Sequence, residues 1–520
     1  MKKVVKKIVK IINDENKNID SEEIKKNNSN NKLKILLITH NFPPEWYAGV
    51  EIYTYNFAKT LIERGHDVSV LYPKLDLTIK LPTLKEDFYS DIKVYKLLVN
   101  NTNLSLHIEN HEIENVFAEL IRKKKFSIVH FQHTHQFLPF SLLKIAKEQG
   151  YKVSLTLHDF WFMCPRTHLY IPKTNIVCDG PETIDKCVQC LLADLFTEFT
   201  PAQKASLYYT IAYRSEYVKK LFEDIDFISA PSKYLAKKYT SYGFGKNNKI
   251  KGLPLGLKSI FRKKVNNINS KYIKFGYIGT IHKLKNVNLL IDAFKTVKGN
   301  AKLIIWGNGQ SEEIKKIKNA TFEDDRIEYR GGYTPKNLTE ILSEVDIGII
   351  PSLIENYPLT VREFLSAGIP VIASKTGGIP EIIRDGINGI LFNPTNEKEL
   401  CRILQNVVNN PQLIKKLREG ITPIKTIEED AIEWESIYKD LIKKKDKCDI
   451  SIIIPVFNKL EYTKQCLDAL YKVTPNHLFE LIIVNNASTD GTKEFLNEFA
   501  KTYPNVKVIH NQENLGFAKA

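Results

Sequence analysis

Residues 351–374 read PSLIENYPLTVREFLSAGIPVIAS, a strand end, a turn and a helix that carry Glu355 and Glu363 with seven residues between them. Pro358 lies near the first turn of the predicted helix, where a missing N–H group costs little. Backbone N–H groups at the start of a helix bind phosphate or sugar hydroxyl groups, and carboxylates accept hydrogen bonds from hydroxyls. The stretch therefore suits a nucleotide sugar, although most glutamate pairs at this spacing are solvated surface residues.

Strands and helices alternate on both sides of this stretch, which predicts an α/β protein with two Rossmann-like domains. The first domain, residues 33–262, contains the strand candidates KILLITH, DVSVLY, SIVHFQ, KVSLTLH and FISAP. The second domain, residues 263–445, contains KFGYIGT, KLIIWG, DIGIIPS and PVIAS, and we expect the helix around AIEWESIYKDLIKKK to close it. Two such domains that face each other form a ligand-binding cleft at the carboxyl ends of their sheets.

The N-terminal residues 1–32 precede this α/β pattern. Within residues 2–12 the apolar side chains share one helical face and the lysines lie largely opposite, and the residues that follow are polar. A helix of this kind can lie on an anionic bilayer. A solvated basic tail before a flexible linker explains the same pattern equally well.

The composition is that of a globular protein with several cores: 520 residues, 43% of them hydrophobic and 26% charged, with a net charge of +15. The excess of lysine favours acidic partners such as an anionic membrane or a phosphate-bearing substrate, unless it is a compositional bias of the source. We expect no transmembrane helix and no secretory signal. Seven cysteines, an odd number, favour reduced thiols in the cytoplasm.

The glutamate stretch resembles the E-x7-E signature of the retaining family-4 glycosyltransferases, which have the GT-B fold. The matching residues are Pro351, Ser352, Glu355, Glu363, Gly368, Pro370 and Val371, and the match continues through Gly377 and Gly378. The similarity extends in order across roughly residues 33–445. It implies two facing Rossmann-like domains and retaining, metal-independent sugar transfer from a nucleotide sugar.

The resemblance also implies roles for residues of the cleft. Glu355 would hold a sugar hydroxyl, Lys285 in YIGTIHKLKN would offset the charge of the departing diphosphate, and His158 in LTLHDF would lie near the transferred sugar. Glu363 would bind the ribose hydroxyls. The other implied donor-binding residues are Gly49, Tyr357, Pro358, Leu359, Thr360, Gly307 and Gly309.

The chain departs from the family pattern at two positions. In the loop PPEWYAGVEIY, Gly49 is followed by Val50 where the family usually has a second glycine. Thr280 stands where the family often has an arginine, so one of two expected cations is missing. Competing interpretations are a purely structural His158 and a plain tight bend at residues 307–309.

The sequence HDFWFMCPR begins a cysteine-rich insertion. Its cysteines are Cys164, Cys178, Cys187 and Cys190, in the spacing C-x13-C-x8-C-x2-C. Four thiolates can bind zinc tetrahedrally, although this spacing is irregular compared with common zinc ribbons. A subset of related glycosyltransferases carries a similar HD-x-W-x-x-C-P insertion. Two interpretations stay open: structural zinc, or unmetallated thiols that order an insertion loop.

A third α/β unit, residues 449–520, follows the lysine run KKKDK. Its segments ISIIIPVFN, ELIIVNNASTDGT and NLGFAKA resemble the start of a family-2 glycosyltransferase with the GT-A fold. The resemblance places Pro455, Asn485 and Asp490 near a nucleotide, with Asn485 where the family usually has aspartate. Three strands are too few for a complete sheet, so we expect a truncated domain rather than an inactive remnant. A divalent metal would be needed only by a complete family-2 domain.

The leading functional hypothesis is transfer of one sugar from a UDP-, GDP- or TDP-sugar to a glycan or lipid-linked acceptor in cell-surface polysaccharide synthesis. The family-4 unit would require no cofactor, and we expect no nucleic-acid partner. We expect a cytoplasmic protein, with peripheral contact at the inner membrane face as an open alternative. The main competing hypothesis is a nucleotide-sugar-binding pseudoenzyme or scaffold. A sugar-nucleotide epimerase fits the motif order less well, and no G-x-G-x-x-G motif supports a dehydrogenase.

Overall fold

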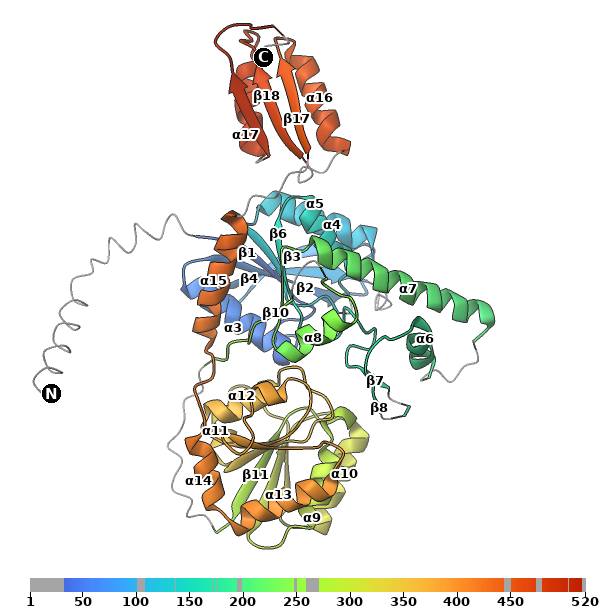
Figure 1. Ribbon diagram of the computed structural model, residues 1–520, viewed down its shortest axis with the longest axis vertical. Helices are drawn as coiled ribbons and strands as arrows, with labels where there is room; N and C mark the ends of the chain where they lie inside the picture. Colours follow the sequence, from blue (N-terminus) through green and yellow to red (C-terminus); the bar gives the residue numbers. More distant parts are fainter. Residues whose placement is uncertain are drawn as a thin grey trace, which may run out of the picture.

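The structure is a computed structural model that describes residues 32–100, 108–135, 137–171, 173–174, 176–193, 199–246, 250–258, 271–443, 450–473, 479–503 and 505–516. The predicted amphipathic helix and linker within residues 1–31, most of the KKKDK run and Cys448 lie outside the described residues. The ribbon shows two large α/β domains and a smaller third unit (Figure 1).

The first domain is built on an eight-stranded sheet in the order β10-β9-β6-β5-β1-β2-β4-β3. Its strands are β1 (Lys34–Ile38), β2 (Asp67–Leu75), β3 (Thr83–Tyr89), β4 (Ile92–Val99), β5 (Ile128–Phe131), β6 (Lys152–Thr156), β9 (Phe227–Ala230) and β10 (Lys251–Gly252). Only the edge pair β3–β4 is antiparallel among these described strands. In β1, Leu36 and Ile38 belong to one core cluster and Ile35 and Leu37 to another. The strand is therefore buried on both faces, as its continuous apolar run predicts.

Helices cover both faces of this sheet. They are α3 (Gly49–Glu63), α4 (His111–Lys124), α5 (Ser141–Glu148), α7 (Pro201–Asp224) and α8 (Lys233–Ser241). The cysteine-rich insertion contributes the short hairpin β7 (Tyr170–Ile171) and β8 (Ile176–Val177) and the helix α6 (Ile184–Leu192). In Figure 1 the insertion lies at the side of the first domain, below α7.

The second domain has a six-stranded parallel sheet in the order β13-β12-β11-β14-β15-β16. Its elements are β11 (Ile273–Ile278), the 3₁₀ turn η1 (Lys283–Lys285), α9 (Val287–Lys295), β12 (Ala301–Trp306), α10 (Ser311–Glu323), β13 (Ile327–Gly331), α11 (Leu338–Ser343), β14 (Ile347–Ile350), α12 (Leu359–Ser366), β15 (Val371–Ser374), η2 (Ile379–Glu381), β16 (Gly389–Phe392), α13 (Glu397–Asn409) and α14 (Gln412–Glu419). Because β11 and β14 are neighbours, the loops that follow them adjoin at the carboxyl edge of the sheet.

Helix α15 (Ile427–Lys443) differs from the sequence prediction, which has it close the second domain. It packs against α3 of the first domain, and Figure 1 shows the two helices side by side. Its buried residues form a stripe at helical spacing within a first-domain core cluster: Ile427, Ala431, Trp434, Tyr438 and Leu441. The helix therefore returns the chain to the first domain and ties the two domains together.

A buried carboxylate on α15 reinforces this connection. Asp430 accepts hydrogen bonds from the Tyr53 hydroxyl at 2.9 Å, the Gly256 backbone N–H at 2.8 Å and Lys425 Nζ at 2.6 Å. Tyr53 lies on α3, whereas Gly256 lies in the segment that leads toward the second domain. Burial raises the pKa of Asp430, and Lys425 opposes that rise.

The third unit is a small parallel sheet in the order β17-β18-β19. Its elements are β17 (Ile450–Val456), α16 (Leu460–Val473), β18 (Phe479–Asn485), α17 (Thr492–Thr502) and β19 (Val506–His510). The predicted fold class, two parallel α/β domains followed by a smaller α/β unit, is confirmed.

Candidate active site

An ion pair joins two of the three predicted catalytic residues. Lys285, in the turn after β11, donates from Nζ to Glu355 Oε1, which follows β14. The Ser352 hydroxyl donates to the same oxygen at 2.8 Å. The pair is partly exposed, with 26% of the lysine side chain and 12% of the glutamate side chain accessible. A ligand can therefore reach a positive and a negative group from the same side.

Two glycines hold the backbone of Glu355 in place. The Gly378 N–H donates to the Glu355 carbonyl at 2.9 Å. Gly377 has a φ of +56°, and a Cβ at this position would lie 1.6 Å from the same carbonyl oxygen. Only glycine allows this close approach. Close packing against the backbone of Glu355 therefore accounts for the two glycines of the TGG turn without any contact to a ligand.

Glu363 lies on α12 with its side chain buried. Its Oε2 atom has no hydrogen-bond partner within the described part of the chain. Burial raises the pKa of Glu363 to about 7, although the neighbouring Arg362 lowers it in part. An unsatisfied buried carboxylate is costly, and two hydroxyls of a ligand would satisfy it.

The residues between the two glutamates form the start of α12. Pro358 is the N-cap residue, and the helix begins at Leu359. The N–H groups of Leu359 and Thr360 belong to the first turn, where no intrahelical partner exists. Tyr357 packs its ring 4.7 Å from the guanidinium of Arg362, so its side chain serves the packing of the turn.

The predicted nucleotide turn at residues 307–309 is shaped by a close contact between two loops. A Cβ at Gly307 would lie 1.9 Å from the Gly279 carbonyl oxygen, and one at Gly309 would lie 1.8 Å from that of Ile281. The loops after β11 and β12 therefore touch through their backbones. Packing alone requires these glycines, and contact with a nucleotide stays a prediction.

His158 follows β6 of the first domain and faces the second domain. Its carbonyl oxygen accepts a hydrogen bond from Asn356 Nδ2 at 3.2 Å, next to Glu355. Its Nε2 donates to Gln132 Oε1 at 2.9 Å. Burial and the nearby His133 lower the pKa of His158 to about 3. The imidazole is therefore neutral at pH 7 and is a hydrogen-bonding group rather than a cation or an effective base.

Further polar residues surround His158 that sequence reasoning missed. His133 Nε2 lies 2.9 Å from Asp159 Oδ2, and His40 Nε2 lies 3.1 Å from the buried Glu51. Burial raises the pKa of Asp159, but the charge and hydrogen bond of His133, the Trp161 N–H and His168 together more than offset this, and the pKa falls below its usual range. The available signal was the run HFQHTH, with three histidines at the end of the buried strand β5.

Gly49 is the first residue of α3, and a Cβ there would meet no atom within 4 Å. The space beside Gly49 is therefore open, and packing alone does not require glycine at this position. Whether a diphosphate approaches Gly49 stays a prediction. Thr280, in place of the expected arginine, accepts a hydrogen bond at its carbonyl oxygen from the Tyr277 hydroxyl at 2.7 Å.

The chain was compared with known families and structures. Residues 47–257 match the family described as Glycosyltransferase Family 4, residues 259–422 match Glycosyl transferases group 1, and residues 451–520 match Glycosyl transferase family 2. The chain belongs to the family-4 glycosyltransferases and continues into part of a family-2 unit. The resemblance stated from the sequence is confirmed.

Two relatives and one solved structure show the extent of the similarity. An uncharacterized glycosyltransferase of Methanocaldococcus jannaschii, MJ1607, is 23% identical over 79% of this chain and 97% of its own length. The lipopolysaccharide 1,2-N-acetylglucosaminetransferase of Salmonella typhimurium is 30% identical, over 31% of this chain and only 45% of its own length. Sucrose-phosphate synthase of Thermosynechococcus elongatus aligns with a TM-score of 0.58 at 16% identity, covering 79% of this chain and all of that chain. The last supports the GT-B fold alone.

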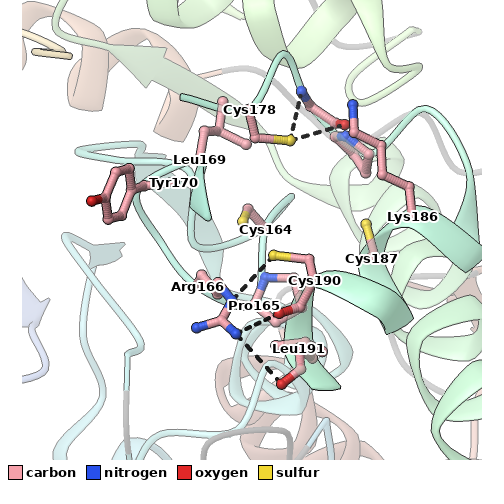
Figure 2. A pocket seen from close by; sticks show the side chains of 12 residues that line it. Cys164, Pro165, Arg166, Leu169, Tyr170, Cys178, Lys186, Cys187, Cys190 and Leu191 are labelled. Carbon is pink, nitrogen blue, oxygen red and sulfur yellow. Dashed lines mark hydrogen bonds between the residues drawn. The ribbon is translucent and has the colours of Figure 1, made fainter. Parts of the chain in front are cut away.

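The four cysteines of the glycosyltransferase's insertion line one small cavity, shown in Figure 2. Each is a free thiol. Burial, together with the neighbouring Cys164, Cys178 and Cys190, raises the pKa of Cys187 to about 12. Among the described residues, no three His, Cys, Asp or Glu side chains converge closely enough to hold a metal ion. The predicted zinc site stays a prediction.

The family-2 unit places its predicted nucleotide residues around the ends of β17 and β18. Pro455 lines a cavity of about 250 Å³. Asn485 is buried and accepts from the Ser488 N–H at 3.1 Å. Asp490 accepts from the Thr492 hydroxyl at 2.6 Å and the Leu460 N–H at 2.9 Å, and the Thr492 contact lowers its pKa. These contacts order the loops, and a role in nucleotide binding stays a prediction.

No helix in the described part of the glycosyltransferase is both long and apolar enough to cross a membrane.

Proposed function

We propose that the family-4 unit transfers a sugar from a nucleoside-diphosphate sugar to a hydroxyl group of a glycan or lipid-linked acceptor, with retention of anomeric configuration. The observation that carries this proposal is the Lys285–Glu355 pair, which lies at the carboxyl edge of the second sheet and is joined to His158 of the first domain through Asn356. A hydroxyl-binding carboxylate and a phosphate-binding cation therefore lie side by side at the domain junction.

The chemistry follows from these charges. As the bond from the sugar to the diphosphate breaks, negative charge develops on the leaving oxygen, and a preorganised cation stabilises that charge. Lys285 supplies it, and its pairing with Glu355 holds the ammonium in position before the donor binds. Glu355 accepts a hydrogen bond from a sugar hydroxyl. The first-turn N–H groups of α12 give further support to the sugar or phosphate.

Glu363 binds the nucleoside part of the donor. Its buried Oε2 atom has no partner among the residues that the structure describes, and the ribose of a nucleotide offers two adjacent hydroxyl donors. The pKa of about 7 means that the carboxylate form is readily reached at physiological pH. Ionisation would then be stabilised by the ligand itself.

The first domain receives the acceptor and the outer face of the transferred sugar. His158 is neutral and its Nε2 donates to Gln132, so its Nδ1 atom can accept a hydrogen bond from a sugar hydroxyl without competing for the donor's phosphates. The similarity to the Salmonella lipopolysaccharide enzyme supports a cell-surface glycan as the acceptor class. We propose that the reaction needs no metal ion, because Lys285 and helix N-termini supply the positive charge, and that it takes place at the cytoplasmic face of the membrane.

The test is nucleotide release by the purified protein from a panel of UDP-, GDP- and TDP-sugars with glycan and lipid-linked acceptors. Lys285→Ala and Glu355→Gln should each reduce turnover by about 100-fold or more, as loss of transition-state charge stabilisation does in other enzymes. The matched controls Lys336→Ala and Glu340→Gln, at exposed positions of the same domain, should leave it unchanged.

Each outcome bears on the proposal. Full activity of either site variant would show that the site is misassigned. Tight binding of a nucleotide sugar without release from any donor–acceptor pair would refute transfer and support the scaffold hypothesis. The scaffold hypothesis is supported by Thr280, which stands where the family often has an arginine.

A further inference from the structure

Four thiols from three separate segments of the insertion surround one cavity of about 20 Å³. This is about the space that one water molecule or one ion fills. In Figure 2 the side chains of Cys164 and Cys190 lie near each other, with Cys187 to their right and Cys178 above them. The catalytic arrangement described above uses none of them.

Backbone hydrogen bonds hold each segment in place. The Cys164 N–H donates to the Phe160 carbonyl at 2.6 Å, and the Cys178 N–H donates to the Leu169 carbonyl at 2.6 Å. Cys187 and Cys190 are three residues apart on α6, so they share one helical face. The four positions are therefore set by the fold of the insertion.

Two positive side chains lie beside this cavity. Arg166 Nε donates to Cys190 Sγ at 3.2 Å, and the same guanidinium donates to the Cys190 carbonyl at 2.6 Å. Lys186 also lines the cavity. Four thiolates bring more negative charge than a zinc ion neutralises, and these two cations would partly offset the excess.

The insertion is also too small to hold itself together by apolar burial. Its elements are a hairpin of two-residue strands, in which only Tyr170 is buried, and one nine-residue helix, in which only Val188 is buried. Small units of this kind usually need disulfides or a structural metal. All four cysteines are free thiols, so the disulfide solution is not used.

We propose that Cys164, Cys178, Cys187 and Cys190 bind one structural zinc ion as a tetrathiolate site. The four side chains do not yet converge closely enough to hold an ion, and Cys178 Sγ instead accepts from the Gly180 N–H at 3.4 Å, so binding requires the thiols to rotate toward the shared cavity. With all four positions occupied by protein ligands, the metal has no open position for catalysis. Its role is to fix the insertion.

The site would act at a distance on the donor side of the cleft. Leu169 and Tyr170 of the insertion belong to the same hydrophobic cluster as Leu284 and Ile354. These two residues directly precede Lys285 and Glu355 in the chain. Zinc would thus hold in place the loop that packs beside the catalytic pair, which links this inference to the proposed function without resting on it.

The test is metal content of the purified full chain, measured by elemental analysis, and it needs no activity assay. We expect about one zinc per chain, lost in Cys187→Ser and Cys178→Ser and kept in Cys401→Ser, a partly buried cysteine of the second domain. Zinc that persists in both insertion variants, or its absence from the wild-type chain grown with zinc, would overturn the proposal.

A second measurement guards against variants that fail to fold. Stepwise modification of the wild-type thiols should release the zinc in parallel with the reaction of four cysteines, and chelation should lower the thermal midpoint until zinc is restored. Fewer than seven reactive thiols after denaturation without reductant would indicate a disulfide and refute the tetrathiolate. Loss of zinc with unchanged midpoint would refute the structural role.

Discussion

Replacing Glu363 with glutamine should stabilise the protein and weaken nucleotide binding at the same time. The carboxyl is buried, and its Oε2 atom has no partner among the described residues. Its pKa rises to about 7 from the ordinary value of 4.5, mainly because of burial. The folded protein therefore holds this proton more tightly than the unfolded chain does.

The sign of the pH dependence follows from this difference. Below pH 4.5 both states are protonated, and the residue costs nothing in ionisation. As the pH rises from 4.5 to about 7, the carboxyl ionises in the unfolded chain but stays protonated in the folded protein, so the free energy of unfolding falls. This loss of stability is complete above about pH 7. The rise in pKa corresponds to about 3 kcal/mol, at ~1.4 kcal/mol for each tenfold change in protonation. Glu363→Gln removes this cost, so we expect a gain of up to ~3 kcal/mol at pH 8 and little at pH 4.

The same substitution should weaken UDP binding. A carboxylate can accept from both ribose hydroxyls, whereas the amide has only one acceptor oxygen. Hydrogen bonds to charged groups contribute ~1.5–3 kcal/mol, which corresponds to roughly 10- to 100-fold in affinity. UDP affinity of the wild type should also fall as the pH drops below about 7, and that dependence should disappear in the variant.

Thermal melting from pH 4 to pH 9, with and without UDP, measures both effects, and GDP and TDP run in parallel cover the other bases. For a domain of this size ~1 kcal/mol shifts the midpoint by ~2–4 °C, so the variant should melt higher by roughly 5–10 °C at pH 8. Glu340→Gln, at an exposed position, is the control. If the variant is no more stable than wild type at pH 8, the claim that the buried Glu363 carboxylate destabilises the folded protein is refuted. Unchanged affinity for all three nucleotides would refute the role of Glu363 in binding.

Two further substitutions test the framework around the site. Tyr53→Phe removes one of three donors to the buried Asp430, and we expect a loss of about 1–3 kcal/mol, seen as a lower thermal midpoint; no change would mean that this contact does not tie the domains. Gly377→Ala brings a Cβ to 1.6 Å from the Glu355 carbonyl and should abolish turnover, whereas Gly386→Ala, also at positive φ but with no atom within 4 Å, should be tolerated. Equal activity of the two alanine variants would contradict the close packing.

The donor side of the site was accessible from sequence because most of it is local. Glu355, Ser352 and Glu363 lie within one strand–turn–helix unit, and the spacing places them at a strand end and a helix start. Lys285 comes from another loop, but β11 and β14 are adjacent, so the order of α/β units brings it close. Parallel topology is regular enough that such neighbours can be inferred.

The first-domain side was not accessible in the same way. The His133–Asp159 contact joins residues 26 positions apart and depends on β5 and β6 being neighbours. The run HFQHTH marks the end of β5, but nothing in it indicates which residue His133 contacts. Histidine and aspartate are also common at surfaces, so the pairing becomes visible only when the fold brings the two strand ends together.

Helix α15 shows a second limit of sequence reasoning. Its apolar stripe, with Trp434 and Tyr438, predicts a buried face but does not say which domain covers it. The expectation that it closes the second domain followed chain order, since sequential elements usually pack together. In the structure this apolar stripe is instead buried against α3, because the chain returns to the first domain after α14.

The segment between the two glutamates is both a binding element and a joint between domains. Arg362, next to Glu363, is buried and donates from Nη1 to the Leu255 carbonyl at 2.8 Å, in the part of the chain that leads out of the first domain. Tyr357 covers the same guanidinium. Helix α12, which carries Glu363, is therefore fixed to the connection between the domains. Because the charge of Arg362 also lowers the pKa of Glu363, movement of this joint would alter the ionisation of the carboxylate that we propose binds the donor.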